Sequence, residues 1–239
     1  MQVGKYYSHK NGHKFIETNY KAELEEVIEA IGQVKATEVL TKRSEEKSKP
    51  PLIFSPEDLN IKIKRFLCPK GWTKSNKTSK KGFTEPKLYW NSAEDKFEDK
   101  IGQKTKGSKE FREMDGLKNK VGLEIQFGKY AFMGYDIFSK MPIFSKRGLI
   151  VCGIEVVVMP SLIRHMSTGV SSFSQIVMDM KARGEADLDI PTLVIGIECS
   201  ETEWAEIAEK RRRYKENPQA LIDSGEVSAG RKGAKPGPK

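Results

Sequence analysis

Two apolar runs rich in β-branched residues constrain the fold of this chain more than any other feature of its sequence. They are GLIVCGIEVVVM at 148–159 and PTLVIGIE at 191–198, and such runs are typical of strands buried on both faces of a sheet. A strand pattern at 121–128 precedes them, and helical patterns at 130–141 and 171–184 alternate with the three strands. This order predicts an α/β fold with a central mixed β-sheet flanked by helices.

The N-terminal segment contains an Asn-Gly pair at 11–12, the dipeptide that tight hairpin turns prefer. The stretches at 3–8 and 14–18 flank this pair, and together they predict a β-hairpin. Two histidines, His9 and His13, lie around the turn without a third ligand in register, so we expect both to be exposed turn residues.

Further helices are predicted outside this alternating region. Apolar residues at helical spacing predict one that ends at Gly32, where glycine suits a C-terminal stop. Another begins after its N-cap Ser55, and a third covers 201–214 with Ser200 as its cap and a basic run at 210–213 that faces solvent or a phosphate. In the helix at 130–141, the residues expected to face inward are Phe132, Tyr135 and either Ile137 or Phe138.

The charge distribution indicates a polyanionic partner. The chain of 239 residues has a net charge of +9, and residues 42–109 alone hold 18 Lys and Arg against 9 Asp and Glu. Nucleic acid is the first partner that such a surplus suggests, although a simple solubility balance is an alternative. Residues 73–110 are lysine-rich and weakly patterned, so we expect loops with at most one short helix there, either solvated or ordered by DNA.

The sequence lacks the features of several protein classes. The longest apolar run is interrupted by Glu155 and is too short to cross a bilayer, and the N-terminus has no apolar signal-peptide core. The three cysteines are widely spaced without a zinc pattern, which predicts reduced thiols in a cytoplasmic protein without membrane contact. Phosphate-cradling glycine motifs and a nucleophile elbow are also absent. We expect one domain over 1–223 and a flexible basic tail at 224–239.

The strand at 121–128 carries polar residues on one face. Its alternation puts Glu124 and Gln126 together, and another acid, Asp115, precedes them across a short basic turn. Two carboxylates that converge from adjacent strands suit a hard divalent cation, which lowers the pKa of a bound water and stabilises charge on a phosphate. The spacing alone is a weak signal, because polar faces of half-buried strands are ordinary.

The segment DGLKNKVGLEIQFGKYAFMGYDIF, at 115–138, resembles the active-site strand of the BglII and BstYI restriction endonucleases and is closest to the BstYI pattern. These enzymes belong to the PD-(D/E)XK nuclease superfamily, in a branch where glutamine replaces the usual lysine. Further similarity follows in collinear order in YSHKNGHKFI, TKRSEEKSKPPLIFSPEDLN, KGW, MSTGVSSF and TLVIGIE. The resemblance covers roughly residues 1–200 and implies a restriction-endonuclease-like fold.

This resemblance implies catalytic roles for the residues around the polar strand face. Asp115 and Glu124 would bind Mg²⁺ together with the backbone carbonyl of Ile125. Gln126 would orient the attacking water, while the metal would supply most of the electrostatic stabilisation that a lysine gives in other members. A structural hydrogen bond to the neighbouring strand is the alternative role for Gln126.

The resemblance also implies a DNA-reading surface. Lys129 would donate to guanine in the major groove, with a plain surface lysine at a strand end as the alternative. Ser75 and Asn76 align loosely with a polar active-site residue of one relative. One serine of the implied base-reading loop is an expected helix N-cap. The residues of that loop are Ser167, Thr168, Gly169, Ser171 and Ser172.

The implied activity is that of a type II restriction endonuclease, a site-specific deoxyribonuclease acting on double-stranded DNA in a prokaryotic cytoplasm. It would be a homodimer, because a palindromic site is read by two-fold-related subunits. Close relatives cut sites built around GATC and leave 5′ GATC overhangs, so the same core is implied here without its outer base pairs. The alternatives are a repair or junction nuclease of the same fold, which usually retains the lysine, and a non-catalytic basic DNA-binding protein, which has no need of the carboxylates.

Overall fold

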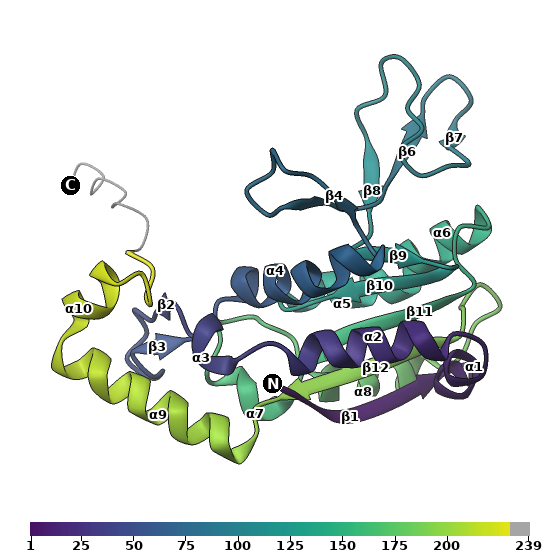
Figure 1. Cartoon of the computed structure of the whole chain (residues 1–239). Helices are drawn as coiled ribbons and strands as arrows, with labels where there is room; N and C mark the ends of the chain where they lie inside the picture. Colours follow the sequence, from purple (N-terminus) through teal and green to yellow (C-terminus); the bar gives the residue numbers. More distant parts are fainter. Residues whose placement is uncertain (230–239) are drawn as a thin grey trace, which may run out of the picture.

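The computed structural model describes residues 1–229 and has a five-stranded mixed sheet at its centre (Figure 1). The three central strands are parallel, whereas an antiparallel strand lies at each edge. In spatial order the strands are β1 (Gln2–His9), β12 (Thr192–Glu198), β11 (Cys152–Val158), β10 (Val121–Ile125) and β9 (Gly116–Lys118). The predicted α/β fold with a central mixed sheet is confirmed.

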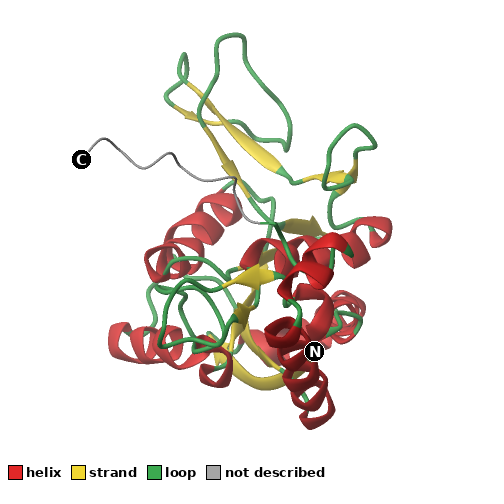
Figure 2. Ribbon diagram, turned by 90° about the vertical axis from the view of Figure 1, so that its left-hand side faces the viewer, coloured by secondary structure: helices red, strands yellow, loops and turns green. Residues whose placement is uncertain are grey.

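Helices cover both faces of this sheet (Figures 1 and 2). On one face they are α1 (Gly12–Asn19), α2 (Lys21–Gly32) and α4 (Pro56–Leu67). On the other face they are α5 (Tyr130–Tyr135), the π-helical turn η2 (Asp136–Lys140), α6 (Met141–Lys146) and α8 (Phe173–Arg183). Among residues 1–229, no helix has the length and apolar character needed to cross a membrane.

The alternation along β10 and β11 decides which side chains face which helical layer. Leu123 and Ile154 join the core cluster of α2 and α4, while Val157 joins the cluster of α5 and α8. Glu124 and Glu155 are register partners on these parallel strands and point to the same side as Val157. Both carboxylates therefore lie beneath the layer formed by α5, η2 and α6.

The predicted N-terminal hairpin is wrong. β1 pairs with β12, and the segment after the turn forms α1 instead of a returning strand. Asn11 has a left-handed φ of 57°, and a Cβ at Gly12 would lie 2.4 Å from the backbone of Thr192, so the Asn-Gly pair serves a close strand-to-helix turn. His9 is buried rather than exposed, and its Nε2 lies 3.0 Å from Oδ2 of Asp189.

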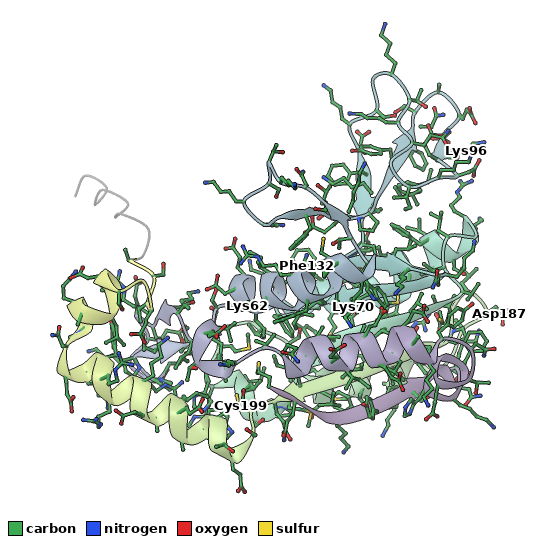
Figure 3. The ribbon with its side chains drawn as sticks, in the orientation of Figure 1. Lys62, Lys70, Lys96, Phe132, Asp187 and Cys199 are labelled. Carbon is green, nitrogen blue, oxygen red and sulfur yellow. The ribbon has the colours of Figure 1, made fainter. Side chains whose placement is uncertain are left out.

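Residues 73–113 form an arm in which short strands join long loops, so the loops predicted at 73–110 are present but strands take the place of the predicted short helix. The arm follows the 3-10 turn η1 (Cys68–Lys70) and projects from the body in Figures 1 and 2, and Lys96 in Figure 3 lies far out on it. Its strands are β4 (Lys74–Ser75), β5 (Phe83–Thr84), β6 (Lys87–Asn91), β7 (Lys96–Phe97) and β8 (Phe111–Glu113). Trp90 packs edge-on against Phe97 with ring centroids 5.0 Å apart, which joins two of these strands.

The helix predicted at 130–141 continues to Lys146 through the π-helical turn. Ile137 is buried as expected, but Phe132 is 57 % exposed and Met133 enters the core in its place. A π-helical turn widens the helical repeat and is frequent at functional sites. In this chain it brings two charged side chains, described below, beneath the helix.

The C-terminal helices close one end of the molecule. These helices and their neighbours are α9 (Glu201–Glu216), α10 (Pro218–Asp223), α3 (Ala36–Val39), β2 (Lys42–Arg43), β3 (Leu52–Ile53) and α7 (Pro160–Ile163). Lys210 is buried and donates to the carbonyls of Thr37 and Glu226, so the basic run of α9 does not face solvent as a whole. Helix α10 was not expected from the sequence pattern.

Packed structure continues beyond Ser224, where the flexible tail is predicted to begin. Val227 is buried, and the backbone N–H of Ser228 donates to the carbonyl of Thr41 at 2.9 Å. These contacts attach the start of the predicted tail to the body of the domain. The remainder of the tail prediction, at 230–239, lies outside the described residues.

Candidate active site

A tight turn brings the first two candidate residues together. Asn119 and Lys120 have left-handed φ values of 45° and 70°, as a two-residue hairpin turn requires, and they join β9 to β10. Asp115 precedes β9, and its Oδ2 accepts a 2.8 Å hydrogen bond from the backbone N–H of Ile125. The Asp115 carboxylate therefore lies beside the residue that follows Glu124.

A buried lysine from α4 holds Asp115. The Nζ of Lys64 lies 2.8 Å from Oδ1 of Asp115 and 2.8 Å from Oε1 of Glu85, and the Lys64 side chain is 4 % exposed. Burial by itself would lower the pKa of Lys64, but the two carboxylates outweigh it and raise that pKa. Lys64 therefore remains an ammonium and fixes one oxygen of Asp115.

Glu124 lies on β10, between β9 and β11, and is 2 % exposed. Lys140, at the end of η2, places its Nζ 2.8 Å from Oε1 of Glu124 and 2.6 Å from Oδ1 of Asp136. Burial, and then the negative charge of Asp115, raise the pKa of Glu124 well above its ordinary value, and Lys140 opposes this in part. Additional positive charge would stabilise the Glu124 carboxylate, because it replaces lost solvation.

A third acid, Glu155, was not identified from the sequence. It is fully buried on β11 beside Glu124, and neither of its carboxylate oxygens has a hydrogen-bond partner within residues 1–229. Burial, followed by the charges of Asp136 and Glu124, raises the pKa of Glu155 well above its ordinary value. The sequence did carry a signal, because an acid inside a strand buried on both faces needs a partner or a function.

Beyond the acids, β10 ends at an open hollow of about 240 Å³. Asn60 of α4 donates to the carbonyl of Ile125 at 2.9 Å, and Gln126 donates through Nε2 to the carbonyl of Lys129 at 3.1 Å. Asn60, Ile125 and Gln126 line the hollow together with Lys81 of the arm. Asn60 was missed in the sequence, because an asparagine within a helical pattern has no chemical signature of its own.

The predicted base-reading loop lies against β2 and the segment that joins β2 to β3. Lys42 donates to the hydroxyl of Ser167 at 2.7 Å. The hydroxyl of Thr168 lies 2.7 Å from Nζ of Lys49 and 2.7 Å from Oε1 of Glu46. Two hydroxyl groups of the loop are therefore held by charged side chains that lie more than a hundred residues earlier in the sequence.

The far end of this loop is buried. Gly169 is exposed with a left-handed φ of 85°, whereas the side chains of Ser171 and Ser172 are buried. Ser172 is the N-cap of α8 and forms a capping box, as expected for one serine of the loop. Lys129 pairs with Val170 in an isolated β-bridge, so the strand-end lysine lies against the same loop.

Ser75 and Asn76 belong to the arm. Both lie at the β4–β5 hairpin of the arm, where Asn76 donates to the hydroxyl of Thr84 at 2.8 Å and accepts from that of Thr78 at 2.7 Å. The described hydrogen bonds of Asn76 all lie within this hairpin. The alignment of these two residues with an active-site residue stays a prediction.

Comparison with known proteins identifies the family. A family model for the restriction endonucleases BglII and BglIII matches residues 5–197. The chain belongs to this family. A solved structure of restriction endonuclease BglII complexed with a DNA 16-mer has a similar fold, with a TM-score of 0.57 and 18 % sequence identity over 84 % of this chain and 78 % of that chain. A search of curated proteins gave no significant match.

Members of the BglII/BglIII family are restriction endonucleases, nucleases that bind DNA and generally use a divalent metal ion. Asp115, Glu124 and the Ile125 carbonyl offer the hard oxygen donors that such an ion prefers. The ammonium groups of Lys64 and Lys140 already stand against the two carboxylates, which indicates that these oxygens attract positive charge. In the described part of the chain no three His, Cys, Asp or Glu side chains form a metal-binding group, so two carboxylates and a carbonyl would be the protein's contribution. This donor set fits the ion.

Proposed function

We propose that this chain is a type II restriction endonuclease that hydrolyses double-stranded DNA at a specific palindromic site with Mg²⁺. The observation that supports the proposal is that Asp115 lies close enough to Glu124 to raise its pKa, and that the next two residues of the strand, Ile125 and Gln126, line the hollow. A protein that only bound DNA would gain nothing from two carboxylates beside a phosphate, because like charges repel.

Asp115 and Glu124 would hold the metal ion together with the Ile125 carbonyl, and the bound ion would activate a water and stabilise charge on the scissile phosphate. Asn60 fixes the Ile125 carbonyl through its 2.9 Å hydrogen bond and so orients the third oxygen. Lys64 and the Ile125 N–H each hold one oxygen of Asp115. These contacts arrange the donor atoms before the substrate arrives, which reduces the reorganisation that the reaction needs.

Gln126 is proposed to orient the attacking water. A neutral amide cannot supply the positive charge that a lysine gives at this strand position, so its contribution is geometric. Its Nε2 is engaged by the Lys129 carbonyl, and its Oε1 is an acceptor at the hollow. A water held by this oxygen would have a defined direction of attack.

The DNA is proposed to follow the edge formed by the hollow, the 167–172 loop and the β4–β5 hairpin. Residues 73–84 of that hairpin contain four lysines and no acid. Arg65 of α4 donates to the carbonyl of Lys81 at 3.2 Å and so anchors the hairpin beside the hollow. Lysines on phosphates supply affinity and position without reading sequence.

The proposed recognition site is a GATC-centred palindrome cut before its G to leave 5′ GATC overhangs. Two copies of the chain would read it as a homodimer, in a prokaryotic cytoplasm and as part of a restriction–modification pair. Because the hydroxyls of Ser171 and Ser172 are buried, these two serines are proposed to shape the loop. Direct base contacts are assigned to Lys129, Ser167, Thr168 and Gly169.

Digestion of plasmid DNA with Mg²⁺, followed by sequencing of the fragment ends, tests this proposal. We expect discrete fragments that all carry 5′ GATC ends, and no cleavage when EDTA removes the metal. Discrete ends at another sequence would disprove the recognition site but not the endonuclease. Cleavage restricted to branched DNA would instead favour a structure-specific nuclease, and tight binding without cleavage would favour a binding protein.

A further inference from the structure

The formal charges around the candidate site do not balance. Five carboxylates face three ammonium groups in this cluster, which leaves a formal surplus of two negative charges when all are ionised. The acids are Asp115, Glu124, Glu85, Asp136 and Glu155, and the lysines are Lys64, Lys81 and Lys140. A cation that binds among these acids favours their ionised forms, because its charge replaces the solvation lost on burial.

The surplus lies entirely on one side of the cluster. Asp115 and Glu85 share Lys64, and Lys81 adds a second ammonium 3.1 Å from Glu85, so this side is neutral. The other side contains three acids and one lysine. Lys140 is the cation that contacts them among the described residues.

Lys140 contacts two of its three acids. Its Nζ lies 2.8 Å from Glu124 and 2.6 Å from Asp136, and the side chain is 12 % exposed. Glu155, the third acid, is fully buried with both oxygens unpartnered within residues 1–229, although the charge of Lys140 acts on it. A flexible lysine side chain can move its ammonium between neighbouring acceptors without a change in the backbone.

The identity of Gln126 increases the importance of this lysine. The strand position that would otherwise supply a cation holds a neutral amide, and its Nε2 is turned to the Lys129 carbonyl. The positive charge beside Glu124 therefore comes from the π-helical turn of the covering helix. The same ammonium lies against Oε1, one of the two oxygens that Glu124 could offer to a metal ion.

We propose that Lys140 is the resident counter-ion of Glu124 and that its ammonium moves onto Asp136 and Glu155 when a divalent cation binds at Glu124. This inference rests on the proposed function, because it takes Glu124 as a metal ligand. After the move every acid of the cluster has a cationic partner, and the two charges of the ion match the surplus of two. Lys140 is thus a positioning residue that holds Glu124 before the metal arrives.

Calorimetric titration of the full, DNA-free chain with Ca²⁺ tests the exchange. Lys140→Met should bind Ca²⁺ at least about ten-fold more tightly than the wild type, because a competing charge is removed. Lys146→Met removes the same charge from an exposed position of the same helical segment and should leave the affinity unchanged. Equal or weaker binding by a folded Lys140→Met protein overturns the proposal, and so does the absence of Ca²⁺ binding in both proteins.

A second variant tests the destination of the ammonium. Glu155→Gln should weaken Ca²⁺ binding several-fold in the wild-type background, because the displaced lysine loses an acceptor. It should have a much smaller effect when Lys140 is already replaced. Equal effects in both backgrounds would mean that Glu155 acts only through its own charge, which overturns the exchange. Lys140→Gln takes the place of Lys140→Met in this cycle if the methionine variant does not fold.

Glu124→Gln separates the failure of this inference from that of the proposed function. If this variant binds Ca²⁺ as well as the wild type does, the ion is not at Glu124, and the proposed metal site fails as well. If it loses binding while the Lys140 and Glu155 variants keep wild-type affinity, only the exchange of counter-ions is overturned.

Discussion

Glu124 and Gln126 lie two positions apart on one strand, yet their environments are opposite. Glu124 is 2 % exposed and paired with Lys140, whereas Gln126 lines the open hollow. One residue thus faces the proposed metal and the other faces the position proposed for the attacking water. Their variants should therefore fail in different ways.

Gln126→Ala should slow single-turnover cleavage in Mg²⁺ by at least about ten-fold, because an oriented water matters chiefly in the transition state. Ca²⁺-supported binding of the same duplex should change little.

Lys129→Ala should do the reverse and lose about 1–3 kcal/mol of preference for the cognate duplex over one with a single changed base pair. If Lys129→Ala weakens binding to both duplexes equally, Lys129 contacts a phosphate and not a base.

His165 predicts a pH dependence of stability. Its Nδ1 accepts from Arg211 at 3.1 Å, and burial, with the charges of Arg211 and Arg164, lowers the pKa of His165 from 6.5 to about 4. The unfolded chain therefore binds the proton first as pH falls, so stability is present above the unfolded pKa and is lost between about pH 6.5 and pH 4. Because the side chain is only partly buried, solvent screens these charges, and we expect a loss of about 1 kcal/mol.

Urea denaturation at about pH 7 and about pH 5 measures this loss. His165→Gln should be less stable than the wild type at the higher pH and should lose less stability at the lower pH. His13, a half-buried histidine elsewhere in the chain, offers a matched control through His13→Gln. An unchanged pH dependence in His165→Gln would refute the assignment of this titration to His165.

The sequence predicts the candidate site only where the signal is local. Strand alternation and a short turn place Asp115, Glu124 and Gln126 near one another, and the resemblance of residues 115–138 to the family's active-site strand implies their roles. Lys64 lies 51 residues from its partner Asp115, and nothing around it in the sequence indicates an acid nearby in space. Glu155 stands out in the sequence because it interrupts an apolar run. Its location beside Glu124, however, depends on the register between β10 and β11.

For helices and strands as well, the predictions are correct where the sequence signal is local and wrong where the structure depends on distant contacts. β11 and β12 are buried on both faces, and their composition alone identifies them. β1 had two candidate partners, the next segment or a distant strand, and it pairs with β12 because Gly12 permits a close turn into α1. The arm strands β4, β5 and β7 are two residues long, too short for any alternation to appear.

The β4–β5 hairpin predicts a purely electrostatic phenotype. Replacing Lys74, Lys77 and Lys80 by Gln should weaken binding to all duplexes and flatten the salt dependence, since each phosphate contact adds roughly 0.9 to its slope. The cut site and the catalytic rate on saturating DNA should not change. Binding isotherms at several salt concentrations measure the effect.

An equal loss of charge elsewhere provides the control for the hairpin. Replacement of Lys5, Lys14 and Lys21, in β1, α1 and the start of α2, should leave the salt slope nearly unchanged. If both triple variants lower the slope by the same amount, the hairpin has no special contact with DNA and general charge explains its effect.

At the scale of the whole molecule, one chain contains one Asp115–Glu124 pair, and double-strand cleavage of a palindrome therefore needs two copies. Mixed dimers of wild type and Glu124→Gln should cut one strand of a plasmid site and accumulate nicked circles. Wild type mixed with Glu110→Gln, an exposed acid of the arm, should give linear DNA. Linear product from the first mixture, after exchange of subunits is verified, would argue against one active site per strand.

Asp115 and Glu124 are proposed to form a metal-dependent site for phosphodiester hydrolysis. The most direct test is single-turnover cleavage of a GATC-containing duplex in Mg²⁺ by Asp115→Asn, together with Ca²⁺-supported binding of the same duplex and Glu110→Gln as control. We predict that cleavage falls by at least about 10³-fold while specific binding persists, because the metal ligand is lost and the base contacts remain. Cleavage by a folded Asp115→Asn protein at close to the wild-type rate would contradict the claim.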